Sequence, residues 1–459
     1  MRALLLSTYD LGRQPFGLAS PAAWLRRAGV DVACVDLAKG RLDDAAIAQA
    51  DVVAVHLPMH TATRLALPVI RRVRARNPAA RLIAYGLYAP PNAALLQATG
   101  VQTVLGPEYE RDLLDAVCAA APGGTAPNAP PPVATAVPRH VGRPLARLPF
   151  IQPDRSGLPA LSRYASLQLP DGTRRVTGYT EASRGCKHRC RHCPVVPVYD
   201  GRFRAVPVDV VLADIAAQVA AGAGHITFGD PDFLNGPRHA ERIVRALADA
   251  HPGLTYDVVV KVEHILRHPD VMRTLAATGC LFVTSAVESI DDAVLEKLEK
   301  GHTRADFERA VAFMRDIGLP LAPTLVAFTP WTTRAGYVAL LDAIEVLGLV
   351  SHVAPIQLAI RLLVPQGSRL LELEDVQALV GPFDPEALAY PWAHPDPGMD
   401  RLQRQVTALV GRQLSASRPQ VFEAVRALAR EAAGLGALPP GPPLPARATV
   451  PYLNEPWYC

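Results

Sequence analysis

Short apolar runs alternate with amphipathic segments over the first part of the chain. The runs lie at residues 2–7, 31–37, 51–58, 81–88 and 103–106. The stretches between them carry apolar residues at helical spacing. This alternation is typical of βαβ units whose strands form a doubly wound parallel sheet. We therefore expect a Rossmann-like α/β domain over residues 1–120.

The alternation stops in a segment rich in Pro, Gly and Ala, which cannot hold a regular element. We interpret residues 121–170 as a linker and lead-in of partly extended character. A second Pro-rich stretch begins near residue 437 and ends the chain in a thiol. Residues 437–459 are therefore expected to form a flexible tail.

The alternation resumes after the linker, with apolar runs at residues 175–182, 225–230, 255–262, 281–289, 320–328 and 352–360. Helical patterns separate them, so six strand–helix units predict a partial (β/α)6 barrel over residues 171–368. Such barrels carry their chemistry on the loops that follow the carboxyl ends of the strands. Residues 369–436 are predicted to be mostly helical.

Composition narrows the classes of partner. The net charge of +4, from 47 basic and 43 acidic residues, is too small to indicate a nucleic-acid surface. No apolar run approaches the ~20 residues of a membrane span, so we expect a cytoplasmic protein with no membrane partner. Seven cysteines in 459 residues do not indicate a disulfide framework.

Three of the cysteines lie together in "SRGCKHRCRHCP", where Cys186, Cys190 and Cys193 have the spacing C-x3-C-x2-C. They follow the first predicted barrel strand, where a catalytic loop is expected. Three thiolates can hold one iron–sulfur cluster and leave one iron without a protein ligand. Basic residues between the cysteines favour the thiolate form. A structural zinc site completed by His188 or His192 is the alternative.

This cysteine spacing after the first barrel strand resembles the radical S-adenosylmethionine (radical SAM) superfamily. The resemblance implies a [4Fe–4S] cluster on the three cysteines, with the amino and carboxylate groups of SAM on the fourth iron. It also implies an external electron donor, such as flavodoxin or ferredoxin. His192, the residue before the last cysteine, would pack on the adenine of SAM.

Three further segments extend the resemblance. "HITFGDPDFLNGP" is similar to the family's second-strand segment, which implies that Gly229, Asp230 and Pro231 hold the SAM amino group. A carboxylate suits an ammonium group, although Asp stands here for the more usual Glu. The remaining SAM contacts implied are Glu288 and Ser289, near the ribose or amino acid end, and Arg361, which leaves the sixth strand to pair with the carboxylate.

The N-terminal layout resembles the cobalamin-binding domains that precede many radical SAM barrels. The usual D-x-H-x-x-G loop is absent, and "HLPMH" places His56 and His60 at a different spacing. Gly86 stands where the family carries a Gly-Gly pair. We expect a scaffold or lid rather than a cobalamin site, although some relatives bind cobalamin without a His ligand.

The end of the chain carries a narrower resemblance. The cysteine loop, "PDRSGLPALSRYASL", "GDPDFLNGP" and "YLNEPWYC" together resemble a radical SAM group whose members end in Cys-Sec-Ala-Glu-Pro or Cys-Cys-Ala-Glu-Pro. That group includes the radical SAM enzyme of arsinothricin biosynthesis. Because this chain stops after the first Cys of that pattern, we expect a selenoprotein reading truncated at a UGA codon.

The narrower resemblance implies an aminocarboxypropyl transferase. Its 3-amino-3-carboxypropyl group would pass from SAM to arsenite or another soft acceptor, which the soft thiolate of Cys459 would capture. One alternative is an enzyme that makes a 5′-deoxyadenosyl radical to methylate or rearrange an organic substrate, with or without cobalamin. The other is a non-catalytic metal-binding or redox-sensing protein.

Overall fold

The computed structural model describes residues 1–120, 148–436 and 450–454. Its first part is a five-stranded parallel sheet in the order β2-β1-β3-β4-β5. The strands are β1 (Arg2–Ser7), β2 (Asp31–Asp36), β3 (Val52–His56), β4 (Arg81–Tyr85) and β5 (Thr103–Leu105). All five lie within the runs predicted from the sequence.

Helices cover both faces of this sheet and bury two separate apolar clusters. They are α1 (Phe16–Arg27), α2 (Asp44–Ala48), α3 (His60–Arg76), α4 (Ala93–Ala98) and α5 (Glu110–Cys118). The central strand β3 is buried along its whole length, as expected for a parallel strand covered on two sides. Ligands of such sheets bind beyond the carboxyl ends of the strands, where the strand order reverses.

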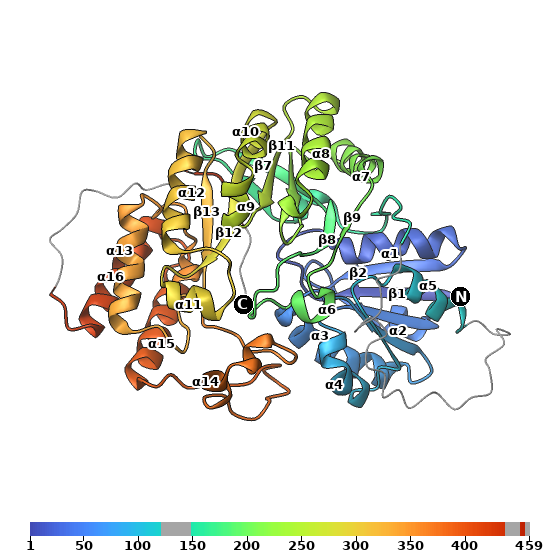
Figure 1. Cartoon of the computed structure of the whole chain (residues 1–459). Coiled ribbons are helices and arrows are strands. Elements are labelled where there is room, and N and C mark those ends of the chain that lie inside the picture. The colour runs from blue at the N-terminus through green and yellow to red at the C-terminus, as the bar shows by residue number, and fades with distance from the viewer. Residues whose placement is uncertain (121–147, 437–449, 455–459) are drawn as a thin grey trace.

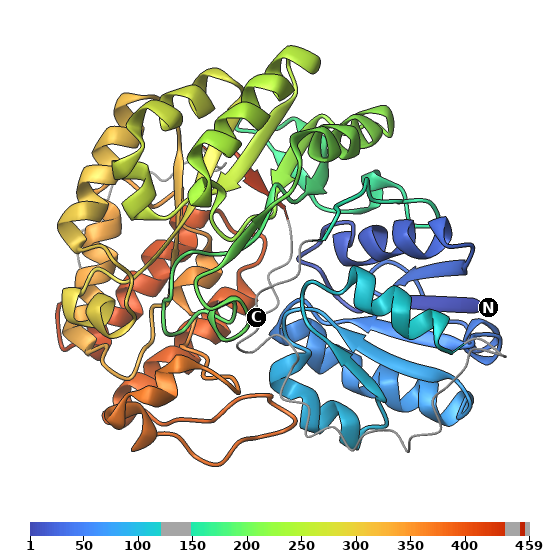
Figure 2. The same cartoon turned by 45° about the vertical axis from the view of Figure 1, so that its right-hand side comes forward.

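The second sheet is curled, and helices lie along its outer face (Figures 1 and 2). Its parallel strands are β7 (Arg174–Thr180), β10 (His225–Phe228), β11 (Thr255–Val259), β12 (Cys280–Glu288) and β13 (Leu321–Leu325). The covering helices are α7 (Val208–Ala220), α8 (Pro237–Ala250), α9 (Val262–Arg267), α10 (Pro269–Ala277), α11 (Asp292–Lys297), α12 (Arg304–Asp316) and α13 (Arg334–Val346). This is the expected partial barrel.

The predicted sixth strand was wrong. Residues 352–360 contain the short 3-10 helix η4 (Pro355–Leu358), and strand pairing is reduced to one isolated bridge between Phe328, just after β13, and Arg361. Proline has no backbone N–H for a ladder but fits the first turn of a helix. The side chain of Gln357 replaces part of the lost ladder, since its Oε1 accepts from the backbone N–H of Leu325 at 2.9 Å.

Two short strands that the sequence did not reveal extend the open edge of this sheet. They are β6 (Ser166–Gln168), from the predicted lead-in, and β14 (Tyr452–Leu453), from the predicted tail. Each pairs antiparallel with its neighbour, in the order β7-β6-β14. Since β6 is antiparallel to both β7 and β14, β14 runs in the same direction as β7. The tail is therefore anchored to the barrel at Tyr452, whose ring also lies 4.5 Å from the Arg418 guanidinium.

The region after the barrel is largely helical, as predicted. Helices α15 (Pro397–Arg412) and α16 (Arg418–Ala432) pair with each other, and α16 packs on α13. The short α14 (Glu374–Gln377) precedes an irregular stretch held by two isolated bridges. No helix in residues 1–120, 148–436 or 450–454 is long and apolar enough to cross a membrane.

A buried arginine joins the two sheets. Figure 1 shows the hairpin of β8 (Ser183–Gly185) and β9 (Phe203–Ala205) between the N-terminal sheet and the barrel. From β8, Arg184 makes two hydrogen bonds to the carboxylate of Glu110 on α5, at 2.6 and 3.0 Å. Its Nε donates to Glu181 at 2.7 Å. Three rings surround the guanidinium carbon at 5.3–5.7 Å: Phe16, Tyr109 and Phe150.

Loss of this arginine should destabilise the whole chain. We expect Arg184→Met to lower the free energy of unfolding by about 3–5 kcal/mol, because it leaves the buried Glu110 carboxylate unpaired. Arg2→Met is the matched control, since the pair of Arg2 with Asp31 is exposed and such pairs contribute about 0–1 kcal/mol. Urea unfolding followed by circular dichroism measures both, and equal effects would contradict this role of Arg184.

Candidate functional site

The cysteine loop begins at a glycine that the backbone requires. Gly185 ends β8 with φ +76°, a conformation that favours glycine. A Cβ there would lie 2.4 Å from both the carbonyl oxygen of Arg202 and the ring of Tyr199. Gly185, the last residue of β8, can therefore be replaced by no other residue without strain, and Cys186 is the next residue in the loop.

The three thiols lie in a pocket with little access to water. Cys186 and Cys190 are buried, and Cys193 is half-buried beside Val195 and Tyr199. Burial raises the pKa of Cys186 to about 11 and that of Cys193 to about 12. Metal binding displaces such protons, because only the thiolate is a ligand. A loop with three buried thiols fits an iron–sulfur cluster.

A second donor set shares one of these cysteines. Ligand atoms of Cys186, His188 and Asp232 lie within 4.8 Å of one another. This set could hold a single ion such as zinc, but it would leave Cys190 and Cys193 unused. The three-cysteine set therefore accounts for more of the loop than this second set does, and zinc held by the cysteines with His188 or His192 stays an alternative.

The segment after β10 holds the cysteine loop from one side. The buried carboxylate of Asp230 accepts hydrogen bonds from the backbone N–H of Ala182, at 3.0 Å, and from the hydroxyl of Ser183. Further along, Asn235 accepts from the backbone N–H of Lys187 at 3.0 Å and donates to the carbonyl of Gly185 at 3.3 Å. These contacts fix the loop on both sides of Cys186.

Asp232 contributes a third point of attachment. Its Oδ2 lies 2.7 Å from Nδ1 of His264 and 3.4 Å from Nε2 of His188 in the loop. Asp232 is fully buried, and its two histidine neighbours outweigh burial and hold its pKa at about 2. The sequence analysis singled out Asp230 but missed Asp232 and Asn235, which were visible only as polar residues after a strand.

The predicted SAM amino-group segment has other partners in this structure. Burial raises the pKa of Asp230 to about 7, although Ser183 and Ala182 act in the opposite direction. Gly229 makes room for a tyrosine, because a Cβ there would lie 1.8 Å from the hydroxyl of Tyr179. Pro231 is exposed. Contact between these residues and SAM stays a prediction.

Two predicted SAM residues, far apart in sequence, meet directly. Nε2 of His192 lies 3.2 Å from Oε1 of Glu288, and Nζ of Lys300 lies 3.4 Å from the same oxygen. Burial raises the pKa of Glu288, but Lys300 and His192 outweigh it and hold the pKa at about 2. The backbone of Glu288 has φ +68°, where the pairing with β13 shifts register. Ser289 follows, half-buried.

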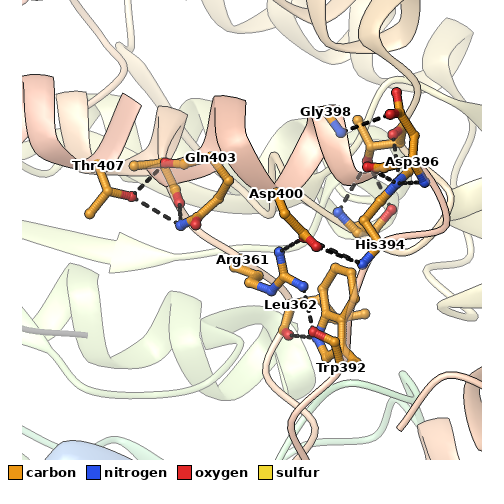
Figure 3. A network of polar contacts seen from close by, with 12 residues as sticks. Arg361, Leu362, Trp392, His394, Asp396, Gly398, Asp400, Gln403 and Thr407 are labelled. Atoms are coloured by element: carbon orange, nitrogen blue, oxygen red, sulfur yellow. Dashed lines mark hydrogen bonds and ion pairs between the residues drawn. The ribbon is translucent and has the colours of Figure 1, made fainter. Parts of the chain in front are cut away.

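Arg361 lies in a different network from the one predicted. Its Nη1 donates to Asp400 on α15 at 2.7 Å, and its Nη2 donates to the carbonyl of Trp392 at 2.6 Å (Figure 3). The guanidinium also lies 3.5 Å from the centre of the Trp392 indole ring. These contacts tie the end of the barrel to the helical region, and a contact with the SAM carboxylate stays a prediction.

The sequence analysis did not predict that Lys261, Lys300 and His302 lie near the cysteine loop. Nζ of Lys261 lies 3.8 Å from Sγ of Cys190. His302 is buried near Lys300 and Lys261, and its pKa falls to about 4 through burial and these two charges. Lys261 lies just beyond the observed end of β11 at Val259. No signal in the sequence indicated it, because it falls inside the run 255–262 that was predicted as a strand.

The two histidines of the N-terminal domain do not fit a cobalt-ligating role. The ring of His56 is buried against Tyr85 and Tyr109, with ring centres 5.2 and 5.8 Å apart. Burial and the Arg184 charge lower the pKa of His56 to about 3. Nε2 of His60 lies 2.6 Å from the carbonyl oxygen of Ala387. Cys459 lies outside the described residues, so its predicted role has no structural test.

Comparison with known proteins identifies the barrel. Residues 180–333 match the family model of the radical SAM superfamily. The matched part of the barrel is similar to a radical SAM domain. The ribosomal protein uS12 methylthiotransferase RimO of Geobacter sulfurreducens is 26% identical over 184 residues, which cover 37% of this chain and 40% of that protein. The hopanoid C-3 methylase of Methylococcus capsulatus is 24% identical over 151 residues, 33% of this chain and 29% of that protein. The chain thus matches less than half of these curated relatives.

Two solved structures resemble the chain over both sheets. The cobalamin-dependent S-adenosylmethionine radical enzyme OxsB has a TM-score of 0.63 at 12% identity, over 90% of this chain and 67% of OxsB. The radical S-adenosylmethionine methyltransferase TsrM of Kitasatospora setae has a TM-score of 0.61 at 19% identity, over 83% and 76%. At these identities the likeness concerns the fold: a cobalamin-binding-like α/β domain beside a radical SAM barrel.

The roles of Asp230 as a loop support and as a SAM ligand can be separated. We expect Asp230→Ala to lower both the free energy of unfolding and the iron bound after reconstitution, because it leaves a buried N–H of Ala182 unsatisfied at a cost of about 1–3 kcal/mol. Pro231→Ala, at the exposed neighbour, is the control and should change neither. Normal stability and iron with weaker SAM binding in Asp230→Ala would instead favour the SAM role.

Proposed function

We propose that the protein is a radical SAM enzyme whose [4Fe–4S] cluster is held by Cys186, Cys190 and Cys193. The observation that carries this proposal is the placement of two buried thiols and one half-buried thiol in a single loop directly after β8. When bound, the cluster supplies the electron that breaks a carbon–sulfur bond of SAM.

The chain's own residues position the reactants. Asp230, Asp232 and Asn235 fix the loop, so the thiols keep one arrangement as ligands exchange. The Glu288 carboxylate orients His192, the residue proposed to pack on adenine. Burial of the thiols keeps water away, which strengthens every charge interaction in the pocket.

For the transferred group, we propose 3-amino-3-carboxypropyl transfer from SAM to arsenite or another soft acceptor, with Cys459 as the capturing thiol. The direction of β14 supports this role. β14 runs parallel to β7, so its direction is towards the end of the sheet from which the cysteine loop follows.

A second candidate is 5′-deoxyadenosyl radical chemistry on an organic substrate, with or without cobalamin. The likeness in fold to OxsB and TsrM, both solved with cobalamin, favours it. The buried contacts of His56 count against histidine-ligated cobalamin in this chain. The protein can be incubated with hydroxocobalamin and purified again. Absence of the visible absorption of cobalamin would then exclude the cobalamin-dependent form of this candidate.

The products of SAM cleavage separate the candidates. We expect the reconstituted protein, given SAM, reductant and arsenite without oxygen, to release methylthioadenosine and an aminocarboxypropyl arsenic compound, both identified by mass spectrometry. Release of 5′-deoxyadenosine would support the second candidate. No cleavage of SAM would support a metal-binding or redox-sensing protein.

Cysteine variants provide the matched controls for that assay. We expect Cys186→Ala, Cys190→Ala and Cys193→Ala each to lose the iron–sulfur absorption and all SAM cleavage, because three ligands are the minimum set. Cys118→Ser, at an exposed cysteine on α5, should keep both. Cluster assembly that survives in all three single variants would contradict the ligand assignment.

The proposed role of Cys459 predicts a separate effect. We expect Cys459→Ser to reduce transfer to arsenite by about tenfold or more, because a hydroxyl is a much poorer ligand than a thiolate for a soft acceptor. SAM binding and iron content should match those of the wild type and of Cys118→Ser. Unchanged transfer at low arsenite concentration would exclude this residue as the capturing thiol.

A further inference from the structure

Lys261 is a buried cation with weak compensation from carboxylates. It is 6% exposed, just beyond the end of β11. In the part of the chain that the structure describes, its ion pairs comprise one contact, with Glu263 at 4.0 Å. That carboxylate also pairs with Arg267 and lies 3.6 Å from His188. A buried ammonium group is costly without a close partner.

A cysteine sulfur lies slightly closer to Lys261 than the Glu263 carboxylate does, and it becomes anionic when the cysteine binds a metal as a thiolate. Nζ lies 3.8 Å from Sγ of Cys190, within hydrogen-bonding distance for sulfur. The charge of Lys261 also lowers the pKa of Cys186, against the larger effect of burial. Lys261 thus acts on two of the three thiols. It follows β11, which pairs with β10 on the edge away from β7.

A second lysine strengthens the positive field without contacting a thiol. Lys300 is 2% exposed and shares the Glu288 carboxylate with His192. Its charge lowers the pKa of Cys193, again against burial. Beside both lysines, neither ring nitrogen of His302 has a hydrogen-bond partner among the described residues. Two buried lysines therefore lie near the thiols, and each shares its carboxylate with other cationic or histidine side chains.

We infer that Lys261 sets the reduction potential of the cluster through its charged N–H···S hydrogen bond to Cys190. This inference rests on the proposed function, because it needs the cluster on the three cysteines. One electron passes to the cluster from a low-potential one-electron donor, and no bond forms or breaks in the protein. The cluster becomes more negative by one charge, so a buried cation stabilises the reduced form more than the oxidised form.

Burial separates Lys261 from the other cations of the loop. Lys187 lies next to Cys186 in sequence, but its side chain is exposed and lies over the ring of Phe203 at 4.9 Å. Exposed charges are screened by water and salt, whereas buried charges are screened much less. Lys187 is therefore a matched control, because it carries the same charge beside the same cysteines but is exposed.

The experiment is a potentiometric titration of the reconstituted full-length protein, without SAM, followed by electron paramagnetic resonance of the reduced cluster. Iron and sulfide are measured first. We expect Lys261→Met to have a more negative midpoint potential, with the ratio of reduced to oxidised cluster at a fixed potential about tenfold lower or more. Lys187→Met and Lys261→Arg should remain close to the wild type.

The outcomes distinguish this inference from the proposed function. A wild-type protein that assembles no cluster would overturn the proposed function, and the inference with it. A wild-type cluster with an unchanged midpoint potential in Lys261→Met would overturn the inference alone. If Lys261→Met assembles no cluster, Lys261→Arg decides, since a midpoint shifted negative despite the retained charge would also overturn the inference. Because SAM is absent, weaker SAM binding cannot produce the shift.

Discussion

The pair of Arg184 with Glu110 is the interaction on which the site depends most. Arg184 lies two residues before Cys186, and Glu110 begins α5 of the N-terminal domain. The pair is almost fully buried, so each charge needs the other. The start of the cysteine loop is consequently held by a domain that contributes no cysteine to it. A shift of α5 would be transmitted to the start of the loop through Arg184, and a buried hydrogen bond from Tyr199 to Glu108 at 2.8 Å joins the same domain to the segment after the cysteines.

The loop is held from a second side by the barrel itself. Asp230 and Asn235, beyond β10, bind backbone groups before and after Cys186. The motifs alone did not predict that Asp230 and Asn235 support the loop by binding its backbone. Acidic and amide residues after a barrel strand resemble ligand contacts, but here they satisfy buried N–H groups of the loop, which cannot be left unpaired. A cluster loop rich in basic residues would otherwise have little internal structure.

The alternation of apolar and polar residues was sufficient to predict most of the fold. It located five strands in each sheet, because parallel strands buried on both faces are continuous apolar runs. It failed at residues 352–360, where Pro355 changed an apolar run into a 3-10 helix. It also missed β6 and β14, which are three and two residues long and form only by pairing with strands distant in sequence or across a turn: β6 with β7, and β14 with β6. The cysteine triplet was readable because its spacing is local, whereas Lys261, Lys300 and Asp232 reach the site only through tertiary structure.

The positions of the cations show why single residues were harder to assign than the fold. Arg361 was predicted to pair with the carboxylate of SAM. In the structure it instead donates to Asp400 and to the carbonyl of Trp392, and these hydrogen bonds join the barrel to α15. Lys261 and Lys300 lie deeper and have only shared carboxylates. Positive charge that protein carboxylates do not neutralise is stable only near another anion. Metal binding would convert the three thiols into thiolates, and Lys261 lies 3.8 Å from one of these sulfur atoms, so the buried lysines and the buried cysteines fit one another.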